Sequence, residues 1–189
     1  MISELRPAFV SVAMFTLLLG VAYPLAMTGA AQALFPHQAN GSLIEQEGAI
    51  LGSTLIGQAF SSEDYFHSRP SAVNYDGAGN GGSNLGPTSA ALMARIDADV
   101  ERLRPSGRRI PVDLVTTSGS GLDPHISPAA ARYQAERVAA AREVPIEEVL
   151  KLVLAATEDR TFGVLGEPRV NVLQLNLTLD AKAGRAEAE

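Results

Sequence analysis

The chain has 189 residues, a formal net charge of −6 and no cysteine. The lack of cysteine excludes disulfide bonds and thiolate metal sites. A mildly acidic chain without a basic cluster does not suit nucleic acid, so no nucleic-acid partner is expected.

The N-terminal region contains an uncharged stretch, residues 7–36, whose centre is apolar nearly throughout. A helix rises about 1.5 Å per residue, so about 20 residues cover the roughly 30 Å hydrocarbon core of a bilayer. We therefore expect a single transmembrane helix at residues 8–34. Pro24 lacks a backbone N–H and clashes with the preceding turn, so it should kink this helix near its outer end.

The charged residues on either side of this span indicate its orientation. Arg6 precedes the span, whereas the next Lys or Arg along the chain is Arg69, with several carboxylates in between. Lys and Arg near a span favour the cytoplasmic side. Residues 1–7 are therefore expected in the cytoplasm, and the main domain on the periplasmic or extracellular side of the cell inner membrane.

Two other interpretations of the apolar stretch stay open. A cleaved signal peptide would also be apolar, and residues 31–33 resemble a small-residue cleavage site. However, the stretch is longer than the roughly 7–15 residues of a typical signal, and the basic region before it is short. A helix buried in a soluble core is seldom apolar on every face.

The rest of the chain is long enough for one domain with a core of its own. We expect residues 35–180 to form an extracytoplasmic α+β domain, with a small sheet and packed helices, and residues 181–189 to form a frayed polar tail. Asn40-Gly41 signals a turn at the start of this domain. The segments 53–58, 110–117 and 173–180 are expected to be strands, from their β-branched content or their alternation of apolar and polar residues.

Three helices are expected in the same domain. The first follows a Thr or Ser cap at residues 88–89, carries one apolar stripe and is ended by the segment 105–107. The second has Ser127 as its cap and reaches about residue 142, and the third begins at Pro145. Both of these should be packing helices.

Residues 74–87 are rich in glycine and asparagine, so we expect them to form a long loop, held at its root by Tyr65, Phe66 and Tyr75. Long loops in small domains are commonly functional or disordered. The loop lacks the Gly-Lys-Ser/Thr ending of a P-loop, so a contact with another protein is favoured over phosphate binding.

A weak hydrolase signal lies between the second predicted strand and the second predicted helix. Ser118, Ser120, Asp123 and His125 are residue types that build nucleophilic triads. The segment does not fit the G-x-S-x-G elbow, and two tight turns followed by a helix cap explain more of its residues. The three histidines lie far apart in sequence, so no metal site is expected.

Several segments together resemble one family, the C subunit of the Kdp-type potassium-transporting ATPase. No single segment is specific, but they cover nearly the whole chain in the family's order. They are Leu5-Arg6-Pro7, Tyr23-Pro24, residues 38–44, 52–53, 55–58, 65–72 (Tyr-Phe-His-Ser-Arg-Pro-Ser-Ala), 81–85 (Gly-Gly-Ser-Asn-Leu), 120–123, 126–128, Gln134, 137–139, 170–171, 175–177 and 179–180.

The resemblance implies a non-catalytic accessory subunit of a high-affinity potassium uptake pump. Its partners would be a channel-like potassium-binding subunit, a P-type subunit that hydrolyses ATP, a small single-span subunit and membrane lipid. In the family, the C subunit has been proposed to raise ATP affinity through a nucleotide-contacting glutamine, for which Gln134 is the nearest candidate. No tightly bound cofactor is expected, and ATP enters only through that family proposal.

The resemblance also marks candidate partner contacts. The span would pack beside partner helices, and the outer domain would rest on the channel-like subunit through the region 65–84. The candidates are Tyr23, Pro24, Tyr65, His67, Arg69, Pro70, Gly81, Gly82, Ser83 and Asn84. A membrane-anchored or secreted module that binds a ligand in its glycine-rich loop is the alternative function.

Overall fold

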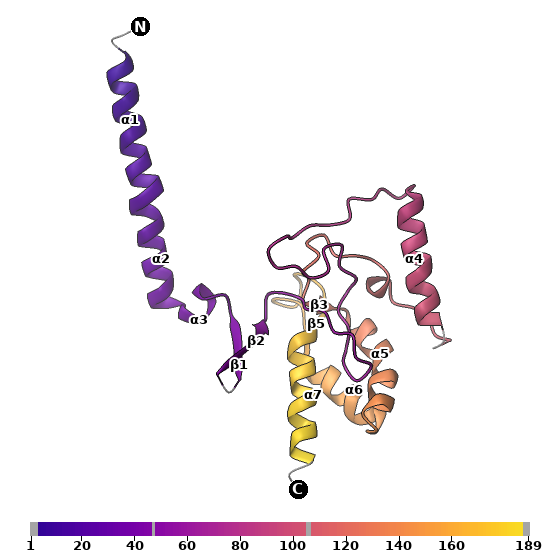
Figure 1. Cartoon of the computed structure of the whole chain (residues 1–189). Helices are drawn as coiled ribbons and strands as arrows, with labels where there is room; N and C mark the ends of the chain where they lie inside the picture. Colours follow the sequence, from indigo (N-terminus) through magenta and orange to yellow (C-terminus); the bar gives the residue numbers. More distant parts are fainter. Residues whose placement is uncertain (1–3, 47, 105–106, 187–189) are drawn as a thin grey trace. The chain divides into compact units, whose positions relative to one another are not determined.

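A computed structural model describes residues 4–46, 48–104 and 107–186 of the chain (Figure 1). The chain separates into two compact units, Met1–Leu51 and Gly52–Glu189. The first unit contains the long helix and the short elements that follow it, while the limit between span and domain after residue 34 stays a prediction.

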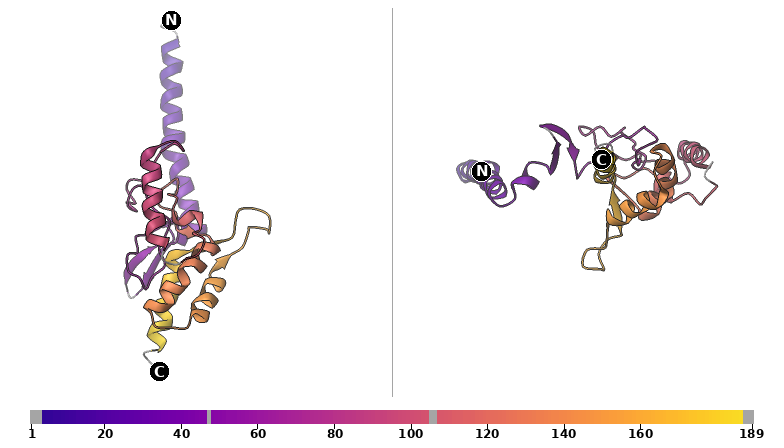
Figure 2. Two further views of the ribbon diagram at one scale, coloured as in Figure 1. Left: turned by 90° about the vertical axis from the view of Figure 1, so that its right-hand side faces the viewer. Right: turned by 90° about the horizontal axis from the view of Figure 1, so that it is seen from below.

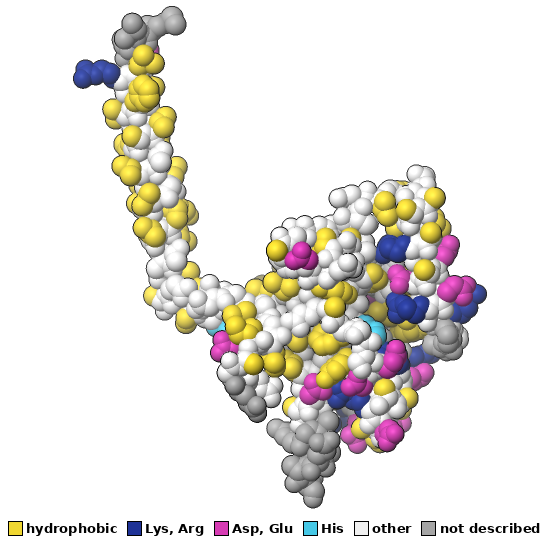
Figure 3. Space-filling view, viewed as in Figure 1, with side chains coloured by type: hydrophobic (Ala, Val, Ile, Leu, Met, Phe, Trp, Pro, Cys, Tyr) yellow, Lys and Arg dark blue, Asp and Glu magenta, His cyan; other side chains and the backbone are white. Residues whose placement is uncertain are grey.

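The first unit is dominated by a continuous helix, Leu5–Leu34, which is long and apolar enough to cross a membrane. It consists of α1 (Leu5–Leu17), a π-helical turn η2 (Leu18–Ala22) and α2 (Tyr23–Leu34), and none of them contains a buried residue. Figure 3 shows apolar side chains along the visible face of this helix. The expected N-terminal apolar helix is thus confirmed.

The π-helical turn lies directly before Pro24, where we expected a kink. A proline cannot donate a hydrogen bond to the carbonyl four residues earlier, which here belongs to Gly20. A local π-helical adjustment can satisfy backbone groups that a proline leaves without a partner. The irregularity therefore has a specific sequence cause.

After the long helix come α3 (Pro36–Ala39) and a two-stranded sheet of β1 (Leu43–Gln46) and β2 (Ala49–Ser53). The predicted turn at Asn40-Gly41 is confirmed, and Gly41 has a φ of +87°. The strand predicted at 53–58 is wrong. The Ser53 hydroxyl accepts a hydrogen bond from the N–H of Leu55, and the N–H of Ile56 donates to the Ser53 carbonyl, so a turn ends β2 there.

The second unit combines helices with a three-stranded antiparallel sheet, as the α+β prediction required (Figure 1). Strand β5 is central: His125 pairs with Asn171 on one side, and Thr157 pairs with Val170 on the other. The elements are α4 (Ala90–Leu103), the 3₁₀-helix η4 (Val112–Leu114), β3 (His125–Ile126), α5 (Pro128–Ala141), α6 (Ile146–Ala155), β4 (Thr157–Glu158), β5 (Arg169–Asn171) and α7 (Val172–Ala186).

The three predicted helices are confirmed, and their caps explain why they begin where they do. The Ser89 hydroxyl accepts from the N–H of Leu92 at the start of α4. The Ser127 hydroxyl accepts from the N–H of Ala130 at the start of α5, and α6 follows Pro145. Most of the segment 105–107 that was expected to end α4 lies outside the described residues.

The core of the second unit lies where α5, α6, α7 and β5 meet. Aliphatic side chains from these four elements are almost completely shielded from solvent. Phe66, which belongs to no helix or strand, is also fully buried in the same cluster. The core members with the lowest exposure include Phe66, Val138, Val149, Val153, Val170, Val172 and Leu175.

The strand predicted at 173–180 is wrong, because these residues form α7. Alternating leucines suggested a period of two, but Val172, Leu175, Asn176 and Leu179 are all buried at the three- and four-residue spacing of a helix. The Asn171 side chain accepts from the N–H of Gln174 and so caps the helix. The helix continues to Ala186, into the segment predicted as a polar tail, whose last residues, 187–189, lie outside the described residues.

The strand predicted at 110–117 is also wrong, since only the short 3₁₀-helix η4 forms there. The Asp113 carboxylate accepts hydrogen bonds from both the N–H and the hydroxyl of Ser127, at 2.7 and 3.1 Å. The Thr116 hydroxyl donates to the Val112 carbonyl at 2.8 Å. These bonds to side chains take the place of a strand ladder.

Candidate functional site

A segment outside the helices and strands, residues 63–67, begins with a turn and is held by side chains along its whole length. Each of its five backbone carbonyls accepts a hydrogen bond from a side chain that lies far away in the sequence. We call residues 63–67 the clamped segment. The carbonyls and their donors are Glu63 with Arg137, Asp64 with Arg142 (2.6 Å), Tyr65 with Arg137 (2.9 Å), Phe66 with Asn176 (3.0 Å) and His67 with Gln134 (3.1 Å).

Two side-chain amides each bond both backbone groups of one residue in the clamped segment. The Asn176 oxygen of α7 accepts from the N–H of Phe66 at 2.9 Å, and the Gln134 oxygen of α5 accepts from the N–H of His67 at 2.9 Å. Each amide therefore both donates to and accepts from the backbone of one residue, as a neighbouring strand would. Gln134 is 4% exposed and Asn176 is 1% exposed, so these bonds are shielded from water.

Arg142, Tyr65 and Asp180 close one end of the clamped segment. The Arg142 guanidinium lies 4.8 Å from the centre of the Tyr65 ring and 2.8 Å from the Asp180 carboxylate. The Tyr65 hydroxyl donates to the other Asp180 oxygen at 3.0 Å. Burial, and then the bond to Asp180, raise the pKa of Tyr65. The three side chains tie the end of α5 to α7 through the clamped segment.

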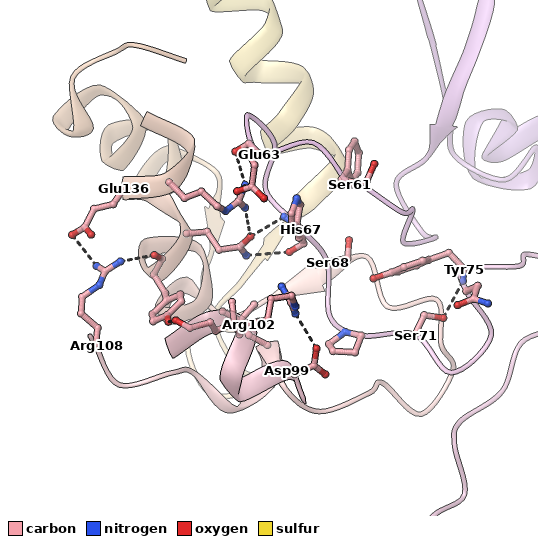
Figure 4. A pocket seen from close by; sticks show the side chains of 18 residues that line it. Ser61, Glu63, His67, Ser68, Ser71, Tyr75, Asp99, Arg102, Arg108 and Glu136 are labelled. Atoms are coloured by element: carbon pink, nitrogen blue, oxygen red, sulfur yellow. Dashed lines mark hydrogen bonds and ion pairs between the residues drawn. The ribbon is translucent and has the colours of Figure 1, made fainter. Parts of the chain in front are cut away.

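A cavity of about 730 Å³ lies beside the clamped segment and is lined from α4 and α5 as well (Figure 4). Its volume lies within the roughly 300–1,000 Å³ typical of small-molecule sites. Three arginines line it, and each is paired with a carboxylate. The pairs are Arg102 with Asp99 (2.9 Å), Arg108 with Glu136 (3.1 Å) and Arg137 with Glu63 (3.5 Å).

These ion pairs limit which ligands the cavity can bind. A phosphate or carboxylate ligand is attracted by cationic groups whose charge is not already balanced. Here each arginine already faces an acidic partner, so the lining offers no excess of positive charge. The polar groups of this region serve mainly to connect elements of the fold to one another.

His67, which also lines the cavity, makes stability depend on pH. Burial lowers its pKa, and the contact of its ring nitrogen with the Ser62 carbonyl (2.9 Å) opposes this only in part. The unfolded chain therefore binds the proton first as pH falls, so stability contributed by neutral His67 is present above about pH 6.5 and is lost below it.

We expect His67→Gln, which keeps a donor for the Ser62 carbonyl, to lose less stability than the unmodified chain between about pH 7 and pH 5. Urea unfolding midpoints at both pH values measure this. Equal losses in the two proteins would show that His67 is not the responsible group.

The structure brings some of the predicted site residues together and separates others. Gln134, His67 and Pro70 line the same cavity. Tyr65 is bonded to Asp180, as described above. Arg69 pairs with Asp123 at 3.2 Å and also contacts the segment 116–117, so its charge is used within the fold. Tyr23 and Pro24 belong to the first unit.

The glycines of the candidate set lie against a second glycine-containing turn, residues 119–121. The N–H of Gly81 donates to the Ser120 carbonyl at 2.8 Å. A Cβ on Gly82 would lie 3.0 Å from the Gly119 carbonyl oxygen, so a larger residue there would require the Gly119 backbone to move by a few tenths of an ångström. Ser83 is half-buried and Asn84 is exposed beyond this contact.

The residues that suggested a hydrolase serve turns instead. The hydroxyls of Ser118 and Ser120 accept hydrogen bonds from the N–H groups of Gly121 and Leu122. Asp123 accepts from the N–H of His125 and pairs with Arg69. Burial would raise the pKa of Asp123, but the bonds from His125 and the charge of Arg69 outweigh it, so that this pKa is lowered.

Sequence reasoning missed three residues that form hydrogen bonds with the clamped segment, namely Asn176, Arg142 and Asp180. Asn176 was assigned to the polar face of a strand. A helical interpretation would have placed it on the buried face with Leu175 and Leu179. The available signal was the pair Asn171 and Gln174, which has the spacing of a helix cap.

Comparisons with known proteins agree over nearly the full chain. The family model described as "KdpC: K+-transporting ATPase, c chain" matches residues 5–181. A "Potassium-transporting ATPase KdpC subunit" of Methylobacterium nodulans is 55% identical over 98% of this chain and 100% of its own length. Proteins with the same name from Rhodopseudomonas palustris and Caulobacter vibrioides are 54% and 56% identical, over 98% and 96% of this chain and 100% and 95% of their own lengths.

Proposed function

Since the chain belongs to the KdpC family, the c chain of K+-transporting ATPases, we propose that it is a non-catalytic accessory subunit that stabilises the assembled pump. Its apolar helix anchors it in the cell inner membrane with the N-terminus in the cytoplasm, and its second unit lies outside. The partners are the channel-like potassium-binding subunit, the P-type ATP-hydrolysing subunit and the small single-span subunit.

The observation that best supports this proposal is that the Gln134 side chain forms its hydrogen bonds within the domain. Its amide oxygen accepts from the N–H of His67 and from Arg137, both at 2.9 Å, and its amide nitrogen donates to the His67 carbonyl. A side chain so engaged and nearly buried has little hydrogen-bonding capacity left for a nucleotide. It supports a role in holding the domain rather than in chemistry.

The proposed topology leads to the same conclusion. A domain outside the membrane cannot touch ATP that is hydrolysed in the cytoplasm. An effect on ATP affinity would have to pass through the span as a coupling free energy between two sites. Gln134 would then act on ATP only indirectly, through the stability of the domain.

The variants Gln134→Leu and Asn176→Leu separate the two roles, because each removes an amide that holds one residue of the clamped segment. If Gln134 is structural, both variants should reduce domain stability and should change the KM of the assembled pump for ATP by the same factor, within about twofold. The measurement is potassium-stimulated ATPase activity against ATP concentration.

A change in this KM of tenfold or more that is confined to Gln134→Leu would contradict the structural role and support a nucleotide contact. Asn176→Leu is the matched control, since it disturbs the neighbouring residue in the same way. The unmodified pump gives the reference value for both variants.

A second candidate function, an extracytoplasmic ligand-binding module, rests on the size of the cavity beside the clamped segment. The paired arginines argue against an anionic ligand, so a neutral, hydrogen-bonding molecule such as a sugar would suit the lining better. A chain that purifies alone from detergent and binds a sugar in calorimetry would favour this function over the pump subunit.

A further inference from the structure

Residues 159–168 form a narrow projection between β4 and β5, which we call the apolar finger; Figure 2 shows it as the orange loop that extends from the second unit. Thr161 and Leu165 pair through two backbone hydrogen bonds of 2.9 and 3.0 Å. The N–H of Gly163 donates to the Arg160 carbonyl at 2.9 Å. The tip is therefore an ordered turn with a defined shape.

The tip presents three large apolar side chains to solvent. Phe162 is 89% exposed, Val164 is 72% exposed and Leu165 is 59% exposed. In a soluble domain, neighbouring apolar side chains with this exposure commonly mark a surface that binds another molecule. Of the other two phenylalanines of the second unit, Phe66 is fully buried and Phe60 is partly buried against the core.

The backbone of the tip has a conformation that is unfavourable for a bulky residue at position 162. Phe162 and Gly163 have φ values of +55° and +75°. Phe162 and Gly163 are the central residues of the turn 161–164, in which the N–H of Val164 donates to the Thr161 carbonyl at 3.3 Å, and positive φ at both central residues favours glycine, asparagine and aspartate. A bulky aromatic residue at the first position is an outlier. Because Phe162 is 89% exposed, packing of this side chain does little to compensate for the strain, and such strain is typical of functional sites.

The charges around the tip indicate the kind of surface that it meets. Arg160 pairs with Glu167 at 2.6 Å, and Arg169 pairs with Glu158 at 2.9 Å. With Asp159 also present, residues 158–169 contain three acidic and two basic residues, a net charge of −1. Anionic lipid headgroups attract unpaired Lys and Arg, so this composition disfavours the membrane surface and favours an apolar pocket in a protein.

The size of the apolar finger indicates what kind of protein partner it can bind. A stable complex of two free proteins buries roughly 1,200–2,000 Å², more than three side chains can supply, so the tip alone would not hold a second copy of this chain. A small anchor is enough when the two partners are already tethered, because the second contact then forms at a high effective concentration. A span shared with other membrane subunits provides such a tether.

From these observations we propose that the apolar finger inserts Phe162 into an apolar pocket of another subunit of the same pump. This proposal rests on the proposed function, which supplies the tethered partner. Beyond that function, the proposal identifies Phe162, Val164 and Leu165 as the residues that make the contact. None of them was among the partner contacts predicted from the sequence.

Phe162→Asn tests the proposal with two opposite effects. Asparagine tolerates positive φ and restores the preferred Asn-Gly turn, so the melting temperature of the purified full-length chain should stay the same or rise. The same change removes the aromatic anchor, so the chain should dissociate from the co-expressed pump subunits in mild detergent about tenfold faster or more. Met93→Gln, which alters an exposed apolar residue of α4, should change neither value.

A second measurement identifies the occupant. A photo-crosslinking amino acid in place of Phe162, in the full-length chain within the assembled pump, should form an adduct with another pump subunit. Adducts with phospholipid or with a second copy of this chain would overturn the proposal, as would unchanged dissociation of Phe162→Asn or a lower melting temperature of that variant. If the unmodified chain captures no pump subunit at all, the proposed function itself fails.

Discussion

Replacing Asn176 with leucine is expected to lower the free energy of unfolding by about 2–5 kcal/mol. The change leaves the N–H and the carbonyl of Phe66 without their partners in a site that is shielded from water. Each buried backbone group that loses its partner costs about 1–3 kcal/mol. Leucine has the same number and branching of side-chain heavy atoms as asparagine, so the loss comes from the missing hydrogen bonds and not from a cavity.

Denaturant unfolding of the full-length chain in detergent, followed by circular dichroism, measures this loss. Gln174→Leu is the matched control, because it replaces an exposed amide on the same helix and should change the free energy by no more than about 0.5 kcal/mol. Equal unfolding midpoints for Asn176→Leu and the control would show that the clamped segment does not depend on this amide.

Truncating Phe66 to alanine is expected to cost about 3–5 kcal/mol, the range for removing a buried aromatic side chain. Phe66 is fully buried among side chains of the helical core, and the hydrogen bonds of Asn176 fix the backbone on which it stands. Collapse of the site around the vacated volume is therefore restricted, which favours the upper part of the range.

The chain offers a control for this variant as well. Phe162→Ala removes the same side chain at an exposed position and should leave the unfolding midpoint nearly unchanged. A large loss in Phe162→Ala with a small one in Phe66→Ala would contradict the assignment of core and surface. Combining Phe66→Ala with Asn176→Leu should cost less than the sum of the two, because the sites share one backbone residue.

Local signals in the sequence were enough to predict the long apolar helix and three of the helices in the second unit. Ser127 and Pro128 mark the start of α5 by a hydrogen bond to a residue three positions away, which is information that a short window contains. The same is true of the turn at Asn40-Gly41. These predictions needed no knowledge of which segments meet in space.

The three predicted strands failed for a different reason. The strands of the second sheet are only two or three residues long, too short for a period of two to be recognised. The leucines of α7 alternate by chance with polar residues, and only the burial of Asn176 beside Leu175 reveals the helical face. A two-residue pattern in a short window is compatible with both structures.

The clamped segment was beyond sequence reasoning because its bonds join distant residues. Phe66 and Asn176 are 110 positions apart, and His67 and Gln134 are 67 positions apart. The resemblance had marked both Gln134 and the segment 65–72, but as parts of two separate ideas, a nucleotide contact and a partner contact. The hydrogen bonds between Gln134 and His67 show that both belong to one structural unit.

The most direct test of the accessory role is a pull-down of the tagged full-length chain from mild detergent, with the partners identified by mass spectrometry. ATPase activity is then assayed with and without potassium. The proposed function predicts a complex with the channel-like, ATP-hydrolysing and small subunits whose activity is stimulated by potassium. A chain that is recovered alone, from cells that express all of these subunits, would contradict it.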